Sequence, residues 1–212
     1  MKAEFWHAKW EAGQIGFHRS DPNPALVRHV NALGLSQGAR VFLPLCGKTV
    51  DIGWLRSKGF QVTGAELSEL AVQQLFDELG VSPDVSTLGP LRTYRADGVE
   101  IFVGDIFDLT SETLGPVDAI YDRAALVALP QDMRPRYADH VARITELAKQ
   151  LMITFEYDQS VMAGPPFSVP RAEVTQLYTK HYDLELLEQT EVEGGLKGFC
   201  PAEAFIWLMR RN

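Results

Sequence analysis

Two segments of the chain carry residues of the kind that bind a nucleoside. Gly47 follows an apolar run at 41–45, and Glu66 stands 19 positions after Gly47, at the end of a second apolar run. A carboxylate at about this distance from a glycine turn can accept hydrogen bonds from two ribose hydroxyls. The alternative is that Glu66 only stabilises the first turn of the following helix, where the helix dipole favours a negative charge. The spacing predicts a ribose site if both runs are neighbouring strands of one sheet.

The glycine content of the first turn narrows the choice of nucleoside. The Gly-Lys-Thr of Cys46-Gly47-Lys48-Thr49 resembles the end of a Walker phosphate loop, but Phe42 stands where that loop requires its first glycine. The fingerprint G-x-G-x-x-G is absent as well. A single glycine lets a ligand approach the backbone closely without the concave nest that binds a diphosphate. With Gly104-Asp105-Ile106 as an adenine pocket after a further strand, the pattern predicts S-adenosyl-L-methionine, which has a ribose and an adenine but no phosphate.

Asp122 and Arg123 follow a third apolar run, 117–121. Charges at a strand end can form a simple surface ion pair, which would contribute little to stability. At the carboxyl edge of a central strand, Arg123 would instead lie where an acceptor meets the methyl donor, and its planar guanidinium can hold an anion or stack on a heterocycle. We therefore expect Arg123 to be the catalytic residue and Asp122 to orient it. A role for Asp122 as a general base is the alternative.

Aromatic side chains are concentrated before the first predicted strand, in Phe5-Trp6-His7-Ala8-Lys9-Trp10 and in Phe17-His18. An amphipathic helix could use them simply to cover the apolar interior of the domain. They could also form a lid over the cofactor, because aromatic faces attract a sulfonium cation and a closed lid excludes water. Both interpretations predict an N-terminal helical cover over residues 1–35.

The order of the predicted elements determines where these side chains meet. Apolar runs and turn signals predict strands at 41–45, 60–65, 91–96, 99–103, 117–121, 151–155, 184–190 and 204–209. Apolar periodicity and capping residues predict helices at 24–33, 50–58, 68–79, 130–149 and 170–181, with loops at 81–90 and 156–169. This alternation is typical of an α/β fold, with an open, mostly parallel sheet and helices on both faces. Ligands of such sheets bind beyond the carboxyl ends of the strands.

Composition limits the class of protein. The chain has 212 residues, of which 46% are hydrophobic and 23% charged, so we expect a single domain over 1–212, with the cover at 1–35 and an α/β core at 36–212. The formal charge of −8 disfavours nucleic acid as a partner, and no apolar run approaches the roughly 20 residues that span a bilayer. Two cysteines, Cys46 and Cys200, are too few for a disulfide framework or a structural zinc site. A cytoplasmic monomer without a metal ion is the expectation.

Six segments together resemble a known family, the thiopurine S-methyltransferases in their bacterial form, over nearly the full length of the chain. They are Trp6-(x)3-Trp10 with Phe17-His18, Phe42-Leu43-Pro44-Leu45-Cys46-Gly47-Lys48, Gly64-Ala65-Glu66-Leu67-Ser68, Ile106-Phe107-Asp108-Leu109, Asp122-Arg123-Ala124-Ala125-Leu126-Val127-Ala128 and Gly164-Pro165-Pro166-Phe167-Ser168-Val169-Pro170. The resemblance implies a class I methyltransferase (Rossmann-like) sheet of seven strands, the last inserted antiparallel. It also implies cofactor contacts at Trp10, Leu45, Glu66, Ile106 and Arg123, with Phe17 and Arg123 near the acceptor.

The reaction that the resemblance implies is methyl transfer from S-adenosyl-L-methionine to an aromatic or heterocyclic thiol such as 6-mercaptopurine, leaving S-adenosyl-L-homocysteine. Such thiols are largely thiolates near neutral pH, so we expect an in-line displacement without an obligate general base, with Arg123 stabilising the anion. Phe167, in the 156–169 loop, is expected to contact the acceptor. Bacterial relatives are associated with methylation of selenium and tellurium compounds, which adds tellurite resistance as an expectation.

The first turn departs from the acid-x-Gly-x-Gly-x-Gly pattern of class I methyltransferases at large. Leu43 replaces the acid, and Leu45 and Thr49 replace glycines, so another group must bind the methionyl ammonium of the cofactor. Backbone carbonyls of the turn and the N-terminal cover are the two candidates. Two other functions remain as alternatives. A nucleotide-dependent oxidoreductase should display a diphosphate loop, and a non-catalytic sensor of an adenosyl ligand would need neither Arg123 nor Phe167.

Overall fold

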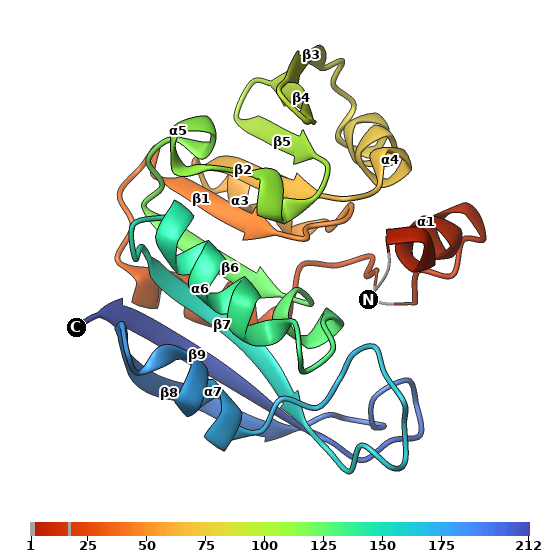
Figure 1. Cartoon of the computed structure of the whole chain (residues 1–212), viewed down its shortest axis with the longest axis vertical. Helices are drawn as coiled ribbons and strands as arrows, with labels where there is room; N and C mark the ends of the chain where they lie inside the picture. The colour runs from red at the N-terminus through yellow and green to blue at the C-terminus, as the bar shows by residue number, and fades with distance from the viewer. Residues whose placement is uncertain (1–2, 17) are drawn as a thin grey trace.

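The described part of the chain, residues 3–16 and 18–212 of a computed structural model, is built around one nine-stranded sheet (Figure 1). The strands are hydrogen-bonded in the order β3-β4-β5-β2-β1-β6-β7-β9-β8. Their bounds are β1 Arg40–Pro44, β2 Gln61–Glu66, β3 Asp84–Leu88, β4 Leu91–Ala96, β5 Val99–Val103, β6 Ala119–Arg123, β7 Lys149–Glu156, β8 Tyr182–Glu191 and β9 Glu203–Arg211.

Five neighbouring strands, β5, β2, β1, β6 and β7, are parallel. β9 lies antiparallel between β7 and β8, which confirms the expected insertion of the last strand. These strands are the seven that the family resemblance implies, but the sheet has two more. β4 pairs with β5 through the predicted Asp97-Gly98 turn, and β3 pairs with β4. The expectation of a seven-stranded sheet is therefore wrong.

The sequence prediction also misses one strand and makes one helix too long. β3 occupies residues 84–88 of the predicted 81–90 loop, and all of its residues are exposed, so it lacks the alternation of buried and exposed side chains by which strands are recognised. The helix predicted at 130–149 is the shorter α6, Arg134–Ile144. Glu146 and Leu147 after it have positive φ angles of 53° and 61°, which a right-handed helix cannot contain.

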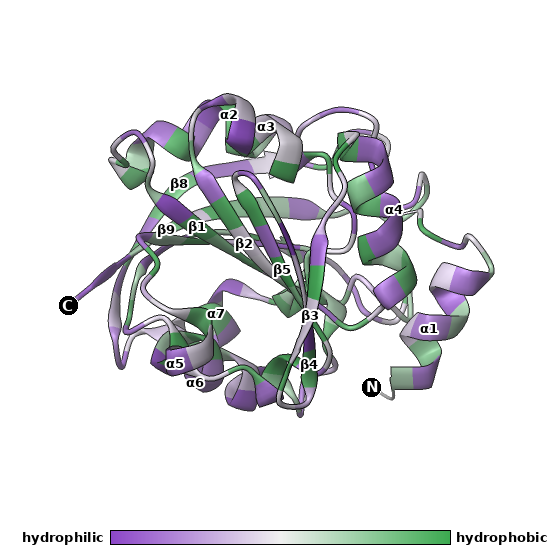
Figure 2. Cartoon of the chain, turned by 90° about the horizontal axis from the view of Figure 1, so that it is seen from above, coloured by the Kyte–Doolittle hydropathy of each residue, from purple (hydrophilic) through white to green (hydrophobic). Residues whose placement is uncertain are grey.

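Helices cover both faces of the sheet, as predicted (Figure 2). On one face are α2 (Pro24–His29), α3 (Asp51–Ser57) and α4 (Glu69–Leu79), and on the other are α5 (Ser111–Leu114), α6 and α7 (Arg171–Tyr178). Short 3-10 helices occupy 30–33, 106–108 and 126–128. α1 (Ala3–Glu11) lies to one side, beside α4. No helix in the described ranges is long and apolar enough to cross a membrane.

Alternate residues of the central strands supply two apolar cores, one on each face. Phe42 of β1 packs with the core under α5, α6 and α7, whereas Val41 and Leu43 pack with the core under α2, α3 and α4. Burial on both faces explains why β1 is continuously apolar in the sequence. Residues 24–33 of the predicted cover contribute Leu26 and Val30 to the second core. This part of the predicted cover therefore belongs to the packed core, whereas α1 lies beside α4.

Candidate active site

The carboxyl ends of β2, β1 and β6 meet at one edge of the sheet, where the order of strands reverses on either side of β1. The β1–β2 register sets Pro44 beside Ala65, which Glu66 follows directly. The β1–β6 register pairs Phe42 with Ile120, so β6, which ends at Arg123, runs beside β1 towards the same edge. Residues predicted from three separate segments of the sequence are thus brought together by the strand pairing.

The turn after β1 has a backbone conformation that residues other than glycine rarely adopt. Leu45 and Gly47 both have positive φ angles, 48° and 54°, and Cys46 N–H donates to the Ala65 carbonyl at 3.0 Å. For leucine this conformation is strained, and such strain is concentrated at ligand sites. A Cβ on residue 47 would stand 3.1 Å from Cζ2 of Trp10. Glycine at this position therefore lets the buried indole of Trp10, from α1, lie directly against the turn.

Glu66 joins this turn to the one after β2. Its carboxylate is buried, with Oε2 accepting the Gly47 N–H at 2.7 Å and Oε1 accepting the Ser68 N–H at 2.8 Å. Burial raises the pKa of Glu66, while the backbone N–H groups of Ser68, Gly47 and Leu67, and the nearby His7, act in the opposite direction. The Ser68 contact supports the helix-start role that the sequence left open. A carboxylate offers about four acceptor positions, so Glu66 can accept from a ribose as well as from the backbone.

The turn after β5 lies against the same carboxylate residue. Gly104 N–H donates to the Glu66 carbonyl at 2.9 Å, which holds the two turns together. Ile106, buried, opens the 3-10 helix 106–108, and the Asp105 side chain caps that helix by accepting the Phe107 N–H at 3.0 Å. An apolar side chain beside the ribose candidate is what an adenine ring requires. The chain thus supplies groups that fit both parts of an adenosine.

Arg123 ends β6, and Ala124 after it has a positive φ angle of 61°. The buried carboxylate of Asp122 accepts the Tyr137 hydroxyl at 2.7 Å and the Leu126 N–H at 3.1 Å. Burial raises the pKa of Asp122 to about 6. These contacts fix the backbone that follows Arg123. Orientation of the guanidinium by Asp122 stays a prediction.

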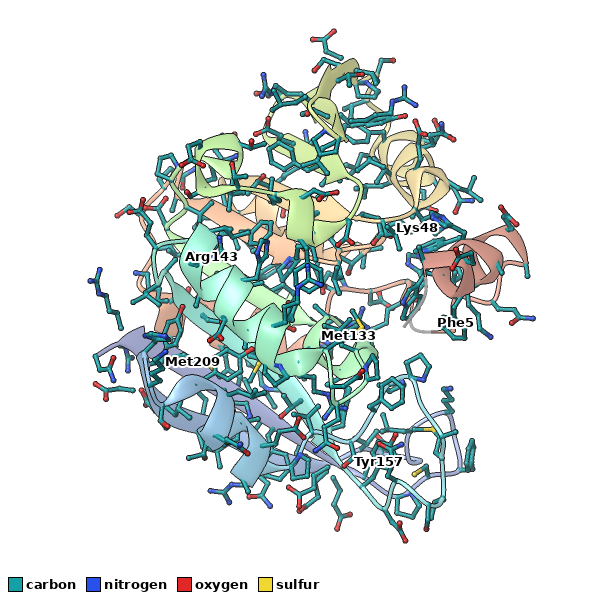
Figure 3. All side chains as sticks on the ribbon, viewed as in Figure 1. Phe5, Lys48, Met133, Arg143, Tyr157 and Met209 are labelled. Atoms are coloured by element: carbon teal, nitrogen blue, oxygen red, sulfur yellow. The ribbon has the colours of Figure 1, made fainter. Side chains whose placement is uncertain are left out.

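Basic groups gather on the other side of the β1 turn. Burial lowers the pKa of His18, and the charges of Lys48 and Arg123 lower it further, while Glu78 acts in the opposite direction. Lys48 forms an ion pair with Glu78 of α4 at 2.5 Å, and its side chain is only 11% exposed. In Figure 3, Lys48 lies between α4 and α1. A lowered pKa keeps His18 neutral near pH 7, and Glu78 pairs with the Lys48 ammonium, so these two groups add little net positive charge to the edge.

The 156–169 loop lies beside the turn that follows Arg123. Phe167 N–H donates to the Val127 carbonyl at 2.6 Å, in the 3-10 helix 126–128. Arg134, buried in α6, donates to the Ser168 carbonyl at 3.0 Å and forms an ion pair with Glu173 at 2.8 Å. The loop is therefore held in place on the side of the edge expected to receive the acceptor.

Two buried polar residues of the site are not predicted by the sequence analysis. Asp51, at the start of α3, accepts the Asn23 N–H at 2.7 Å and the Tyr121 hydroxyl at 3.1 Å, linking the N-terminal segment to β6. His140, in α6, lies with Nε2 2.7 Å from the Ile106 carbonyl. Their partners are distant in the sequence, so no local spacing signals either contact.

Two further expectations concern the acceptor contact of Phe17 and the absence of a metal ion. Phe17 lies outside the described residues, so its contact with the acceptor stays a prediction. Within 3–16 and 18–212, no group of three or more His, Cys, Asp and Glu side chains is placed to hold a metal ion.

Comparison with known proteins identifies the family. The family model described as thiopurine S-methyltransferase matches residues 1–199. A thiopurine S-methyltransferase of Xanthobacter autotrophicus is 55% identical over the whole length of both chains, and one of Teredinibacter turnerae is 51% identical over 100% of this chain and 99% of the relative.

Solved structures share the fold at low sequence identity. The 1,6-didemethyltoxoflavin-N1-methyltransferase of Burkholderia thailandensis, solved with S-adenosylhomocysteine, aligns with a TM-score of 0.67 at 15% identity, over 98% of this chain and 87% of that one. A TehB-like SAM-dependent methyltransferase of Corynebacterium glutamicum aligns with a TM-score of 0.61 at 13% identity, over 99% and 98%. These likenesses confirm the class I methyltransferase fold, and the family assignment decides against the oxidoreductase and sensor alternatives. The chain belongs to the thiopurine S-methyltransferase family, and it is an enzyme that uses S-adenosyl-L-methionine as its methyl donor and releases S-adenosyl-L-homocysteine.

Proposed function

We propose that the acceptor is the sulfur of an anionic aromatic or heterocyclic thiol, such as a thiopurine. The observation that carries this proposal is the convergence of Arg123 with the Gly47–Glu66 pair at the point where strand order reverses. A cation at that point faces the place where donor and acceptor must meet.

The proposed cofactor contacts divide among three turns. Glu66 accepts hydrogen bonds from the ribose, Ile106 packs on the adenine, and the backbone at Leu45 and Gly47 approaches the methionyl part under the indole of Trp10. When bound, the cofactor supplies a methyl group on a sulfonium, and displacement requires the acceptor sulfur in line at about 3 Å. Positioning by the protein therefore supplies much of the catalysis.

Arg123 is proposed to contact both cofactor and acceptor and to favour the thiolate over the thiol by Coulomb attraction and hydrogen bonding. Phe17 and Phe167 are proposed to line the acceptor site. With the thiolate already present, no side chain has to remove a proton during methyl transfer. Asp122 is accordingly assigned to holding the backbone rather than to acting as a base.

The test is a separation of turnover from cofactor binding. Replacing Arg123 by Ala should lower kcat with 6-mercaptopurine by about 100-fold, because the group that favours the bound thiolate and holds its sulfur in line is lost. The affinity for S-adenosylhomocysteine, measured by calorimetry, should change much less. The loss should diminish well above the pKa of the free thiol, where the thiolate forms unaided. Unchanged kinetics in Arg123→Ala would remove Arg123 from the mechanism.

Glu66→Gln is the matched variant, since it removes a charge at the same edge without altering volume. Its expected effect is the reverse: weaker binding of S-adenosylhomocysteine, with kcat at saturating cofactor reduced far less than in Arg123→Ala. If both variants lost affinity and turnover in the same proportion, the division of roles between the two residues would be wrong.

Selenium and tellurium compounds are proposed as further acceptors. Selenite and tellurite are anions of soft elements, so Arg123 would favour them as it favours a thiolate. A host expressing the protein should tolerate more tellurite than one expressing Glu66→Gln at equal levels. Equal tolerance would count against this extension and leave the thiol proposal standing.

A further inference from the structure

We propose that His140 is a positioning residue for the adenine side of the cofactor site, because its imidazole fixes the backbone of Ile106. The inference rests on the proposed function, since it concerns the turn that is proposed to hold the adenine. His140 itself contacts neither of the reacting groups proposed above. It acts through the 104–109 turn, from the helix packed behind it.

The contact between the ring and the turn is direct. His140 lies in α6 and is 5% exposed. Its Nε2 is 2.7 Å from the Ile106 carbonyl oxygen. A carbonyl can only accept, so Nε2 carries the proton and donates it. The bond therefore joins a rigid helix to the first residue of the 3-10 helix 106–108.

A second contact fixes the state of the ring. The Arg143 guanidinium nitrogen Nη2 lies 3.0 Å from His140 Nδ1. A guanidinium can only donate, so Nδ1 must be unprotonated, and His140 is held as the neutral tautomer with its proton on Nε2. In Figure 3, Arg143 lies on α6, the helix behind the turn. A protonated His140 would lose the bond from Arg143 and place two cations side by side.

The charged groups around the ring favour the same neutral state. Burial lowers the pKa of His140 most, and Arg143 and Arg136 lower it further. The hydrogen bond to Ile106 and the charge of Asp105, on the turn itself, raise it. The ring is thus surrounded by two cations from its own helix and one carboxylate from the turn that it holds.

The neighbouring residue of the turn is held from the same helix. The ring of Phe107 meets the imidazole of His140 edge to face, with centroids 5.3 Å apart, and the guanidinium carbon of Arg136 lies 3.7 Å from the Phe107 centroid. Two consecutive residues after β5 are therefore positioned by α6. This arrangement leaves the Ile106 side chain little freedom to turn away from its place at the strand ends.

The turn does not depend on His140 for its existence. The Ile106 carbonyl also accepts the Leu109 N–H at 3.1 Å, and Asp105 caps Phe107 from within the turn. Removing the imidazole therefore leaves no carbonyl without a partner. The expected consequence is loss of orientation at the adenine site rather than unfolding, which separates a positioning role from a purely structural one.

The experiment compares His140→Ala with His140→Gln. The alanine variant should weaken binding of S-adenosylhomocysteine about tenfold by calorimetry, roughly the effect of one lost hydrogen bond. Its kcat at saturating cofactor should stay within about twofold of the wild type, because the acceptor side is untouched. The glutamine amide can donate to the Ile106 carbonyl, so His140→Gln should recover most of the affinity. His29→Ala is the matched control: His29 lies on α2, with Nε2 2.6 Å from a Glu188 carboxylate oxygen, and its removal should leave the affinity unchanged.

The pH dependence gives an independent reading. In the wild type, acidification protonates Nδ1 and breaks the bond from Arg143, but Nε2 still donates to the Ile106 carbonyl, so affinity for S-adenosylhomocysteine should fall in acid in parallel with that of His140→Gln, which has no titrating group at this position. A steeper fall in the wild type would show that the contact with Arg143, rather than the bond to Ile106, carries the effect. Other acidic groups of the site titrate in both proteins and cancel in the comparison.

The outcomes are distinguishable. If wild type fails to bind S-adenosylhomocysteine, the proposed adenosyl site itself is wrong. If wild type binds and His140→Ala binds equally well, or loses kcat as strongly as affinity, the positioning role is wrong. Should His140→Ala not fold, His140→Phe takes its place, because it keeps a ring but cannot donate to the Ile106 carbonyl, and unchanged affinity in that variant would overturn the inference.

Discussion

Two segments lie over the carboxyl edge of the sheet, and they are held there in different ways (Figure 1). In α1 the single buried residue is Trp10, which lies against Gly47. The 156–169 loop is instead fixed by hydrogen bonds: Phe167 to the Val127 carbonyl, Tyr157 hydroxyl to the Pro166 carbonyl at 2.7 Å, and Arg134 to the Ser168 carbonyl. One segment is held by a single buried side chain, and the other is part of a directional network.

The difference matches what each side is proposed to do. A segment that admits and releases a cofactor needs a low free energy of local opening, and few buried contacts provide it. A segment that selects an acceptor needs fixed geometry, which hydrogen bonds from a rigid helix provide. We infer that exchange takes place under α1 and that acceptor choice resides in the 156–169 loop.

The largest expected effect is on the fixed side. Replacing Arg134 by Met removes a buried cation that joins Glu173 and two backbone carbonyls, at Leu129 and Ser168. The free energy of unfolding should fall by about 4 kcal/mol, because buried partners are left unpaired. Urea denaturation measures this. Arg171→Met, a matched change at an exposed position of α7, should cost under about 0.5 kcal/mol.

The next effect depends on pH and concerns Asp122, whose buried carboxylate accepts the Leu126 N–H in the turn after β6. The pKa of Asp122 is about 6 in the folded protein against 3.8 for the ordinary group. A raised carboxyl pKa favours the folded state below pH 3.8, and that contribution is lost as pH rises through 6. Asp122→Asn does not titrate, so its stability relative to wild type should increase by about 2.5 kcal/mol between pH 4 and pH 7. Parallel pH profiles of the two proteins would show that the carboxylate is not destabilised by burial.

The smallest effect on stability is expected at α1. Trp10→Ala should lower the free energy of unfolding by only about 1 kcal/mol, because α1 can detach without disturbing the sheet. Cofactor dissociation, followed by stopped flow, should nevertheless quicken about tenfold, since the indole no longer covers the Gly47 turn. Trp10→Phe should retain part of the cover. A stability loss as large as that of Arg134→Met would break the distinction between the two sides.

Local sequence patterns predicted the elements that carry their own signals. The helix at 68–79 is bounded by Ser68, whose hydroxyl accepts the Ala71 N–H, and by Gly80 with a φ angle of 66°. Both roles depend on the type of residue at a single position, so they can be predicted from the sequence. β3 carries no such signal, because an exposed edge strand buries neither face.

Contacts between distant residues lay beyond such patterns. The pairing of Glu66 with Gly47 can be predicted, because a glycine turn followed at this distance by an acid is typical of ribose binding. His140 and Ile106 are 34 positions apart on different kinds of element, and Asp51 and Tyr121 are 70 apart. Only the packing of a helix against particular strands brings such pairs together, and this packing cannot be predicted from the pattern of a single segment.

The insertion of β9 between β7 and β8 has a consequence for the order in which the protein is assembled. Among the described strands, β8 pairs only with β9, yet β8 is synthesised first. On the ribosome, β7 and β8 must therefore wait with unsatisfied edges until residues 203–211 emerge, while β1, β2, β5 and β6 can already pair. The half of the sheet proposed to bind the adenosyl group can form during translation, whereas the half that carries the 156–169 loop is completed last.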